Sequence, residues 1–288
     1  MIPRRWLLLY GLPAMGFLSL LGLWEGGSVL LGIPQWLLPQ PSRIAVALVR
    51  WGPLLLFHSG ITALETFLGF LLAIAVGVPL AVFIVYSPLL RNTLYPLLIV
   101  TQSMPKVAIA PIFLIWVGYG LQSKVLMALL IAFFPIVIDT VTGFRSVDPD
   151  LVNLTRSLDA SQWQIFREIR FPSALPHLFS GFKVAVTLAL IGAVVGEFVG
   201  ADQGLGNVIL VATGQVKTDV VFAAIVLLSV MGLFLFGLVA LAEYLLVPWA
   251  RTVKEPVLVE GEEVSELDET LRAEEVLSAA DERKKEMG

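Results

Sequence analysis

Long runs of apolar residues, separated by short polar segments, dominate this chain of 288 residues. Hydrophobic residues make up 57% of the sequence and charged residues only 15%, which lies well outside the composition of soluble globular domains. A helix needs roughly 20 apolar residues to cross the hydrocarbon core of a bilayer. Six stretches approach this length, at residues 6–26, 61–84, 94–117, 124–143, 178–200 and 220–248. The sequence therefore predicts an all-α polytopic membrane protein with about six transmembrane helices.

The distribution of basic residues between the spans predicts the orientation. Nine Lys and Arg residues fall in loops on one side of the membrane and four on the other. Because basic loops stay in the cytoplasm, we expect both termini to be cytoplasmic. Arg4 and Arg5 precede the first apolar run, but no small-residue cleavage site follows it. An uncleaved signal-anchor is the expected interpretation.

Charge also separates a transmembrane domain, residues 1–250, from an acidic cytoplasmic tail, residues 251–288. Residues 252–288 contain twelve acidic and five basic side chains. The composition of the tail favours helix, and we expect a partly ordered helix without a specific function.

Several chemistries are excluded by residues that the sequence lacks. There is no cysteine, and the two histidines are isolated, so we expect neither a metal site nor a bound cofactor. No Gly-Lys dipeptide occurs, so a phosphate-binding Walker A loop is absent and the chain cannot hydrolyse ATP itself. We expect no catalytic residues and no nucleic-acid partner.

Two segments between or within the spans are irregular. Residues 32–60 contain too many prolines to cross the membrane, and we expect a short amphipathic helix along the outer interface, with Trp36 and Trp51 near the headgroups. In the third span, Pro105 and Pro111 each remove a backbone donor and are expected to kink the helix. The kink either faces a translocation path or serves packing alone, and the sequence leaves both open.

Four ionisable residues lie within the predicted spans, where charge is costly and often functional. Lys106, beside the Pro105 break, is the best candidate for the translocation pathway, unless it is paired or extends to the interface. Glu197, near the outer end of the fifth span, is expected to hold helices together or contact a partner, with pathway lining as a further alternative. Glu65 and Asp139 are expected to be solvated near the interfaces.

The most informative polar segment is the loop at residues 145–177. Asp148 is a predicted N-cap, with Pro149 in the first turn of a helix that runs to Leu158. A second helix begins at Ser161, where Gln164 completes a capping box.

This second helix carries an aromatic stripe. Trp163, Phe166 and Ile169 recur at helical spacing, and Pro172 and Pro176 are expected to end the run. The two helices form an elbow, which either binds a soluble partner or is simply a solvated face.

The elbow resembles the EAA loop of the permease subunits of binding-protein-dependent bacterial ABC importers. That motif reads Glu-Ala-Ala, three residues, Gly, nine residues, Ile, one residue, Leu-Pro. Its spacing is kept here by Asn153-Leu154-Thr155, Asp159, Ile169 and Phe171-Pro172, with Asn153 in place of the Glu and Asp159 in place of the Gly. Asp tolerates positive φ better than most residues, so the turn is expected to survive.

Other segments look typical of the same family, among them TQSMPKVAIAPIFLIWVGYG, FFPIVIDTVTGFRSVDP and GFKVAVTLALIGAVVGEFVG. The resemblance covers the chain to about residue 250, and is to the branch that includes nitrate, sulfonate, taurine and pyrimidine-precursor systems.

The resemblance implies a type I ABC importer fold in the bacterial inner membrane, with cytoplasmic coupling helices. It further implies a homodimer or paired permease, two cytoplasmic ATP-binding subunits, an external solute-binding protein and contact with membrane lipid. The chain would then be a non-catalytic permease that moves a small polar or anionic solute into the cytoplasm. The residues expected to contact the ATPase are Asn153, Leu154, Thr155, Asp159, Ala160, Phe166, Ile169, Phe171 and Pro172. The pathway candidates are Pro105, Lys106 and Glu197.

An alternative is a secondary transporter or channel that is driven by an ion gradient without an ATPase. It would require polar sites at mid-membrane and often an internal repeat, and it would leave the elbow unexplained. A membrane anchor without transport would leave the broken third span without a role. The sequence does not identify the solute.

Overall fold

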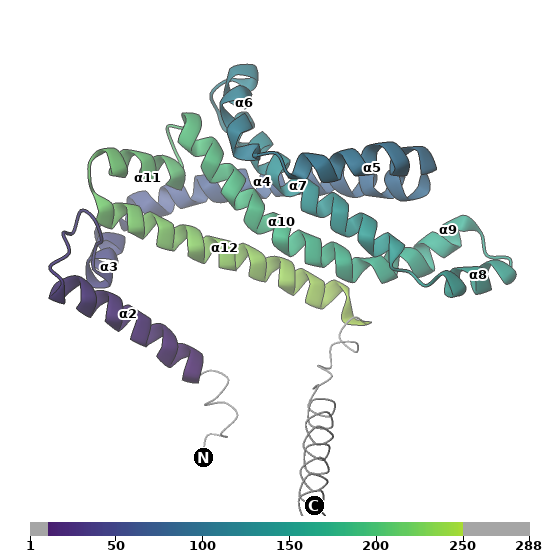
Figure 1. Ribbon diagram of the computed structural model, residues 1–288, viewed down its shortest axis with the longest axis horizontal. Helices are drawn as coiled ribbons and strands as arrows, with labels where there is room; N and C mark the ends of the chain where they lie inside the picture. Colours follow the sequence, from purple (N-terminus) through teal and green to yellow (C-terminus); the bar gives the residue numbers. More distant parts are fainter. Residues whose placement is uncertain (1–10, 250–288) are drawn as a thin grey trace, which may run out of the picture. The chain divides into compact units, whose positions relative to one another are not determined.

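The computed structural model describes residues 11–249 of the chain (Figure 1). All regular elements of this part are helical. In chain order they are α2 (Leu12–Leu30), α3 (Pro41–Arg50), α4 (Gly52–Tyr86), α5 (Pro88–Gln102), η2 (Lys106–Ile109), α6 (Ala110–Val117), α7 (Leu121–Arg145), α8 (Pro149–Ser157), α9 (Gln162–Ile165), η3 (Phe166–Arg170), α10 (Phe171–Gly200), α11 (Leu205–Gly214) and α12 (Thr218–Leu246).

Four helical stretches of the described part are long and apolar enough to cross a membrane: α4, α7, α12, and residues 162–200, which run from α9 through α10. A fifth candidate is the bent pair formed by α5 and the η2–α6 segment. An apolar helix also covers Met15–Leu30, while residues 6–10 of the first predicted span lie outside the described residues, as does the predicted tail at 251–288. The all-α polytopic fold is thus confirmed.

The segment before the second span differs partly from its prediction. A short amphipathic helix is present, but it is confined to α3. Residues 52–60 instead extend α4, which makes the prediction of an interfacial segment through residue 60 wrong at its C-terminal end. Pro53 stands in the first turn of α4, where a helix needs no backbone donor, so proline starts this span rather than interrupting it.

The third predicted span is broken at Pro105 but not at Pro111. Its two halves meet at 92°, and Pro105 precedes the short η2 turn. Pro111 lies in the first turn of α6, so the predicted kink at this residue is wrong. The first turn of a helix needs no backbone N–H donor, so Pro111 is compatible with the start of α6. Pro105, in contrast, lies at the break between the two halves of the span.

The centre of the bundle is α7, which packs against α4 and α10 through very small residues (Figure 1). A Cβ added at Gly69 of α4 would collide with the Cβ of Ala128. On the other side, a Cβ at Gly192 of α10 would lie 2.6 Å from the Ala128 Cα. Two helices therefore approach the same residue of α7 from opposite sides, as small residues allow in membrane bundles.

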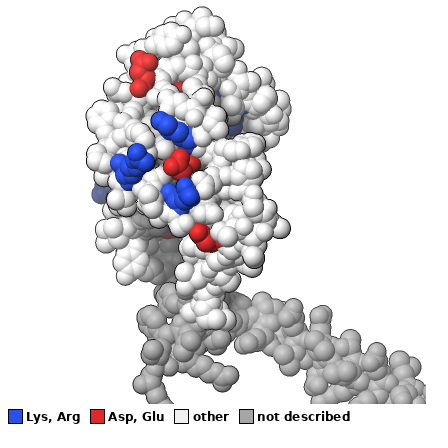
Figure 2. Space-filling model, turned by 90° about the vertical axis from the view of Figure 1, so that its left-hand side faces the viewer, with Lys and Arg blue, Asp and Glu red and all other residues white. Residues whose placement is uncertain are grey.

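The opposite end from the elbow is built by α3, α4, α11 and α12. Ile44, Leu55, Leu205 and Ala223 are buried together there. Figure 2 views the molecule from this side and shows a few charged side chains of both signs, surrounded by uncharged residues.

We predict that Gly192→Ala destabilises the bundle by about 1–3 kcal/mol, because the new methyl group must push α10 away from the backbone of α7. The matched control is Gly237→Ala in α12, where an added Cβ meets nothing within 4 Å. Thermal unfolding of the purified proteins in detergent measures the difference. Equal midpoints for the two variants would contradict the close contact at Ala128.

Candidate functional site

The elbow between α7 and α10 has the caps that the sequence predicts. The Asp148 carboxylate accepts a hydrogen bond from the Asp150 N–H at 2.8 Å. At the second helix, the Ser161 Oγ accepts from the Gln164 N–H and the Gln164 Oε1 accepts from the Ser161 N–H at 2.8 Å. Both helix starts are therefore confirmed, and α8 ends within one residue of its predicted end.

The turn between the two short helices depends on Asp159, whose φ of 62° lies in the left-handed region. The Ala160 N–H donates to the Thr155 carbonyl at 3.3 Å, and the Asp159 N–H donates to the Arg156 carbonyl at 3.0 Å. This pair of bonds is a Schellman motif, which commonly places glycine at the position of Asp159. Asp takes the conformation that the resemblance assigns to Gly, so the prediction that the turn survives is confirmed.

The second helix does not end at Pro172, and that prediction is wrong. A π-helical turn, η3, follows α9 and leads directly into α10. Pro172 stands in the first turn of α10, and Pro176 lies inside it. The irregular hydrogen bonding of the π-turn lets the helix pass the proline, so the elbow is continuous with a membrane span.

Phe166 fixes the elbow to the bundle. Its ring centroid lies 5.7 Å from that of Phe144 at the end of α7 and 6.0 Å from that of Tyr86 at the end of α4. Trp163 and Phe171, at 5.6 and 6.0 Å, complete this aromatic cluster. Such pairs contribute about 0.5–1.5 kcal/mol each beyond burial, so the elbow is held against two other helices.

The elbow has one buried side and one open side. Val152 and Ile165 are buried against the bundle. Leu154, Leu158 and Trp163 are 60%, 75% and 66% exposed. An apolar surface of this kind on a polar loop is typical of a protein interaction site.

The nine residues predicted to contact an ATPase divide between these sides. The exposed ones are Asn153, Leu154, Asp159 and Phe171, and the partly buried ones are Thr155, Ala160, Phe166, Ile169 and Pro172. The structure therefore brings the first group to the open surface, whereas Phe166 packs inside the aromatic cluster.

At the other end of the same helices, Glu197 is fully buried in a polar cluster. Its carboxylate accepts a hydrogen bond from the Thr62 Oγ1 at 2.6 Å and another from the Gly206 N–H. Thr62 in turn accepts from the Leu205 N–H at 2.8 Å. Glu197 thus holds the start of α11, in agreement with its predicted role in joining helices.

Glycine is required where the chain passes this carboxylate. Gly204 has a φ of 106°, and a Cβ there would collide with Glu197. Its N–H donates to the His58 Nδ1 at 2.9 Å. The tight loop before α11 is therefore positioned by side chains of α4 and α10.

Glu65 is 1% exposed, so the expectation that it is solvated is wrong. Its Oε1 lies 3.0 Å from the Nζ of Lys124, which is also buried. Burying the pair together avoids an uncompensated charge in the bundle. The sequence contains one indication that Glu65 is buried in a polar cluster: His58, Thr62 and Glu65 are spaced so that they lie on the same face of a helix.

The other pathway candidates lie at the bend of the third span. Pro105 is exposed, and Lys106 is partly buried with its Nζ 4.1 Å from the centre of the Phe134 ring. A cation over an aromatic face is stabilised without an acidic partner. Within residues 11–249, Lys106 forms no ion pair with Glu65 or Glu197.

The bundle, the broken span and the anchored elbow define a class of protein: a helical membrane protein with an exposed apolar surface on a loop that is fixed to its spans. The family of binding-protein-dependent transport system inner membrane components matches residues 67–245. The formylaminopyrimidine transport permease ThiX of Halalkalibacterium halodurans is 35% identical over 83% of this chain and 96% of its own length. The riboflavin transport permease RibX of Chloroflexus aurantiacus is 38% identical over 82% of this chain and 91% of its own.

Solved structures show the same fold. The membrane chain of the MetNI methionine ABC transporter, in inward-facing conformations, superimposes with a TM-score of 0.57 at 23% identity, over 69% of this chain and 97% of that one. The chain belongs to the family of ABC importer permeases, and the predicted nitrate, sulfonate and taurine branch is confirmed. It is a non-catalytic membrane subunit whose family implies separate ATP-binding subunits and a substrate-binding protein.

We predict that Thr62→Val destabilises the protein by about 1–3 kcal/mol, because it leaves the buried Leu205 N–H without an acceptor and takes a donor from Glu197. Thr140→Val is the matched control. Thr140 is equally buried, but its Oγ1 has no hydrogen-bond partner among residues 11–249. Valine there should be neutral or stabilising. Thermal unfolding in detergent compares the two, and a control that loses as much stability would refute the assigned role of Thr62.

Proposed function

We propose that the open side of the elbow, centred on Leu154 and Asn153, is the surface on which a cytoplasmic ATP-binding subunit docks. The observation that carries this proposal is the combination of an exposed apolar surface with a rigid attachment through Phe166. A loop that only contacts solvent would need neither an exposed apolar surface nor a rigid attachment to the bundle. A force applied to the elbow passes to α7 and α10, as coupling between nucleotide state and helix position requires.

The proposed orientation places the elbow and both termini in the cytoplasm. It is supported by the excess of basic residues in the loops on that side. Two copies of the chain, or one copy and a paired permease, would form the pathway, and an external binding protein would deliver the solute to the opposite end.

The proposed pathway passes the bend of the third span, with Pro105 and Lys106. A span broken at 92° leaves backbone groups that only protein or a water-filled path can satisfy. A lysine whose charge is not matched by an acid suits a small polar or anionic solute. Glu197 is already engaged with α11, so we assign it to holding the outer loop.

We predict that Leu154→Asp weakens binding of the ATP-binding subunit at least tenfold, or about 1.4 kcal/mol, because a charge would be buried in an apolar contact. Leu37→Asp is the control, since Leu37 is 59% exposed and lies in the segment before α3. Co-purification and ATPase activity stimulated by the loaded binding protein are the measurements. Normal binding by Leu154→Asp would exclude this surface as the docking site.

The absence of cysteine from the chain permits a direct test of orientation. Ser157 on the elbow and Gln35 before α3 are both exposed. We predict that Ser157→Cys in intact cells is protected from a membrane-impermeant maleimide and reacts after the cells are opened. Gln35→Cys should react before opening. The reverse pattern would invert the proposed topology without bearing on whether an ATPase binds the elbow.

A further inference from the structure

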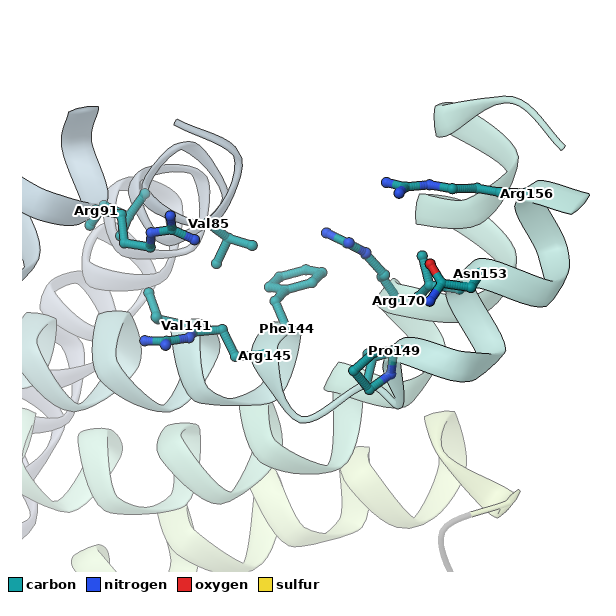
Figure 3. Close-up of a pocket in the computed structure, with 12 residues that line it drawn as sticks. Val85, Arg91, Val141, Phe144, Arg145, Pro149, Asn153, Arg156 and Arg170 are labelled. Atoms are coloured by element: carbon teal, nitrogen blue, oxygen red, sulfur yellow. The ribbon is translucent and has the colours of Figure 1, made fainter. Parts of the chain in front are cut away.

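A pocket of about 340 Å³ lies between the elbow and the adjacent ends of α4, α5 and α7. Four arginines line it: Arg91, Arg145, Arg156 and Arg170. Figure 3 shows Arg91 and Arg145 on one side of this arginine pocket and Arg156 and Arg170 on the other, with Phe144 between them. Four positive charges thus come together from four separate segments of the chain.

These charges have no acidic counterpart within the described structure. No Asp or Glu lines the pocket, and none of the four arginines forms an ion pair with an acid of residues 11–249. Arg170 contacts the Tyr86 ring at 5.3 Å. Asp148, the acid next to the pocket residue Pro149, accepts a hydrogen bond from its own helix. Bringing four like charges together costs free energy, which a bound anion would recover.

The walls of the pocket indicate which kind of anion fits. Guanidinium groups bind phosphate through paired hydrogen bonds, while Val85, Val141 and Phe144 supply an apolar lining. The pocket is at the ends of α4 and α7, two helices that are long and apolar enough to cross a membrane. Phe83 and Leu89, on the helices that meet there, are 63% and 71% exposed and offer apolar surface to a neighbouring acyl chain.

We propose that the arginine pocket binds the phosphate headgroup of an anionic phospholipid of the inner leaflet. Basic pockets between membrane helices on the cytoplasmic side are suited to this ligand. The proposal goes beyond docking of an ATPase and shares with it the orientation of the elbow and one residue, Asn153, which lines the pocket. The lipid would bridge Arg91 and Arg145 of the bundle to Arg156 of the elbow, and would thereby stabilise one position of the elbow.

Asn153 makes the pocket selective for an external anion. Its side chain lines the pocket beside Arg156, at the position where the family motif has glutamate. A carboxylate there would pair with an arginine from within and compete with the lipid phosphate for it, whereas the amide leaves all four arginines unpaired. Asn153→Glu should therefore weaken binding of the lipid, and Asn153→Gln, which adds the same length without the charge, should not.

The test uses the full-length protein, purified from a mixture of phosphatidylglycerol and phosphatidylcholine, with the retained lipids counted by native mass spectrometry. We expect Asn153→Glu and the pair Arg91→Gln with Arg145→Gln to lower retained phosphatidylglycerol at least fivefold. Asn153→Gln and the pair Arg43→Gln with Arg50→Gln, which removes two charges outside the pocket, should retain it. Phosphatidylcholine retention should be the same in every variant.

Three results would overturn the proposal. The first is retention of phosphatidylglycerol by Asn153→Glu at the level of the unchanged chain. The second is displacement of the lipid by millimolar inorganic phosphate, which would identify a soluble anion as the ligand. The third is loss of the lipid when the ATP-binding subunits assemble, which would show that a protein acid fills the pocket. Each result can occur while the elbow still binds the ATPase, so this proposal and the docking proposal fail separately.

Discussion

The close approach of α4 and α10 to Ala128 of α7 is the contact on which the rest of the structure depends. Without side chains at Gly69 and Gly192, the three helices approach nearly to backbone contact, and dispersion contacts replace the hydrophobic effect that a bilayer cannot provide. The polar cluster around Glu197 and the elbow lie at opposite ends of these helices. The polar cluster joins α4, α7 and α10 through Glu65, Lys124 and Glu197, and the aromatic cluster joins them at the elbow.

One continuous helix connects these two ends. Residues 162–200 form a single helical stretch of 39 residues, and at 1.5 Å per residue it spans roughly 58 Å. It begins in the capping box of the elbow and ends close to Glu197, which holds the loop before α11. A displacement of the elbow would therefore reach the loop before α11 through one continuous helical stretch and would not have to pass along a series of separate side-chain contacts. The π-turn at η3 and Pro176 inside α10 are the irregular positions of this stretch at which it can bend.

The features that local sequence determines were predicted well. The caps at Asp148 and Ser161, and the left-handed turn at Asp159, depend on residues within five positions of one another, so their physical chemistry can be read directly. The spans follow from apolar length alone. The errors at Pro111 and Pro172 share one cause. Proline is unfavourable in the interior of a regular helix, although Pro176 lies inside α10, and it is well suited to the first turn. Which of these positions a proline takes depends on where the preceding helix stops.

Features made by residues distant in sequence could not be predicted in the same way. Thr62 and Glu197 are separated by 135 positions, and neither residue alone indicates that they meet. Glu65 looked solvated because its partner, Lys124, belongs to another span. The four arginines are a further case, since each one resembles an ordinary basic residue of a cytoplasmic loop. Only the packing of α4, α5, α7 and the elbow brings the same charges that predict the orientation together in a pocket. Once the four arginines come together, the identity of residue 153 matters in a way that the motif alone does not indicate. The amide of Asn153 leaves the positive charge of the pocket to be balanced by a bound ligand, whereas a carboxylate would offer a partner within the chain.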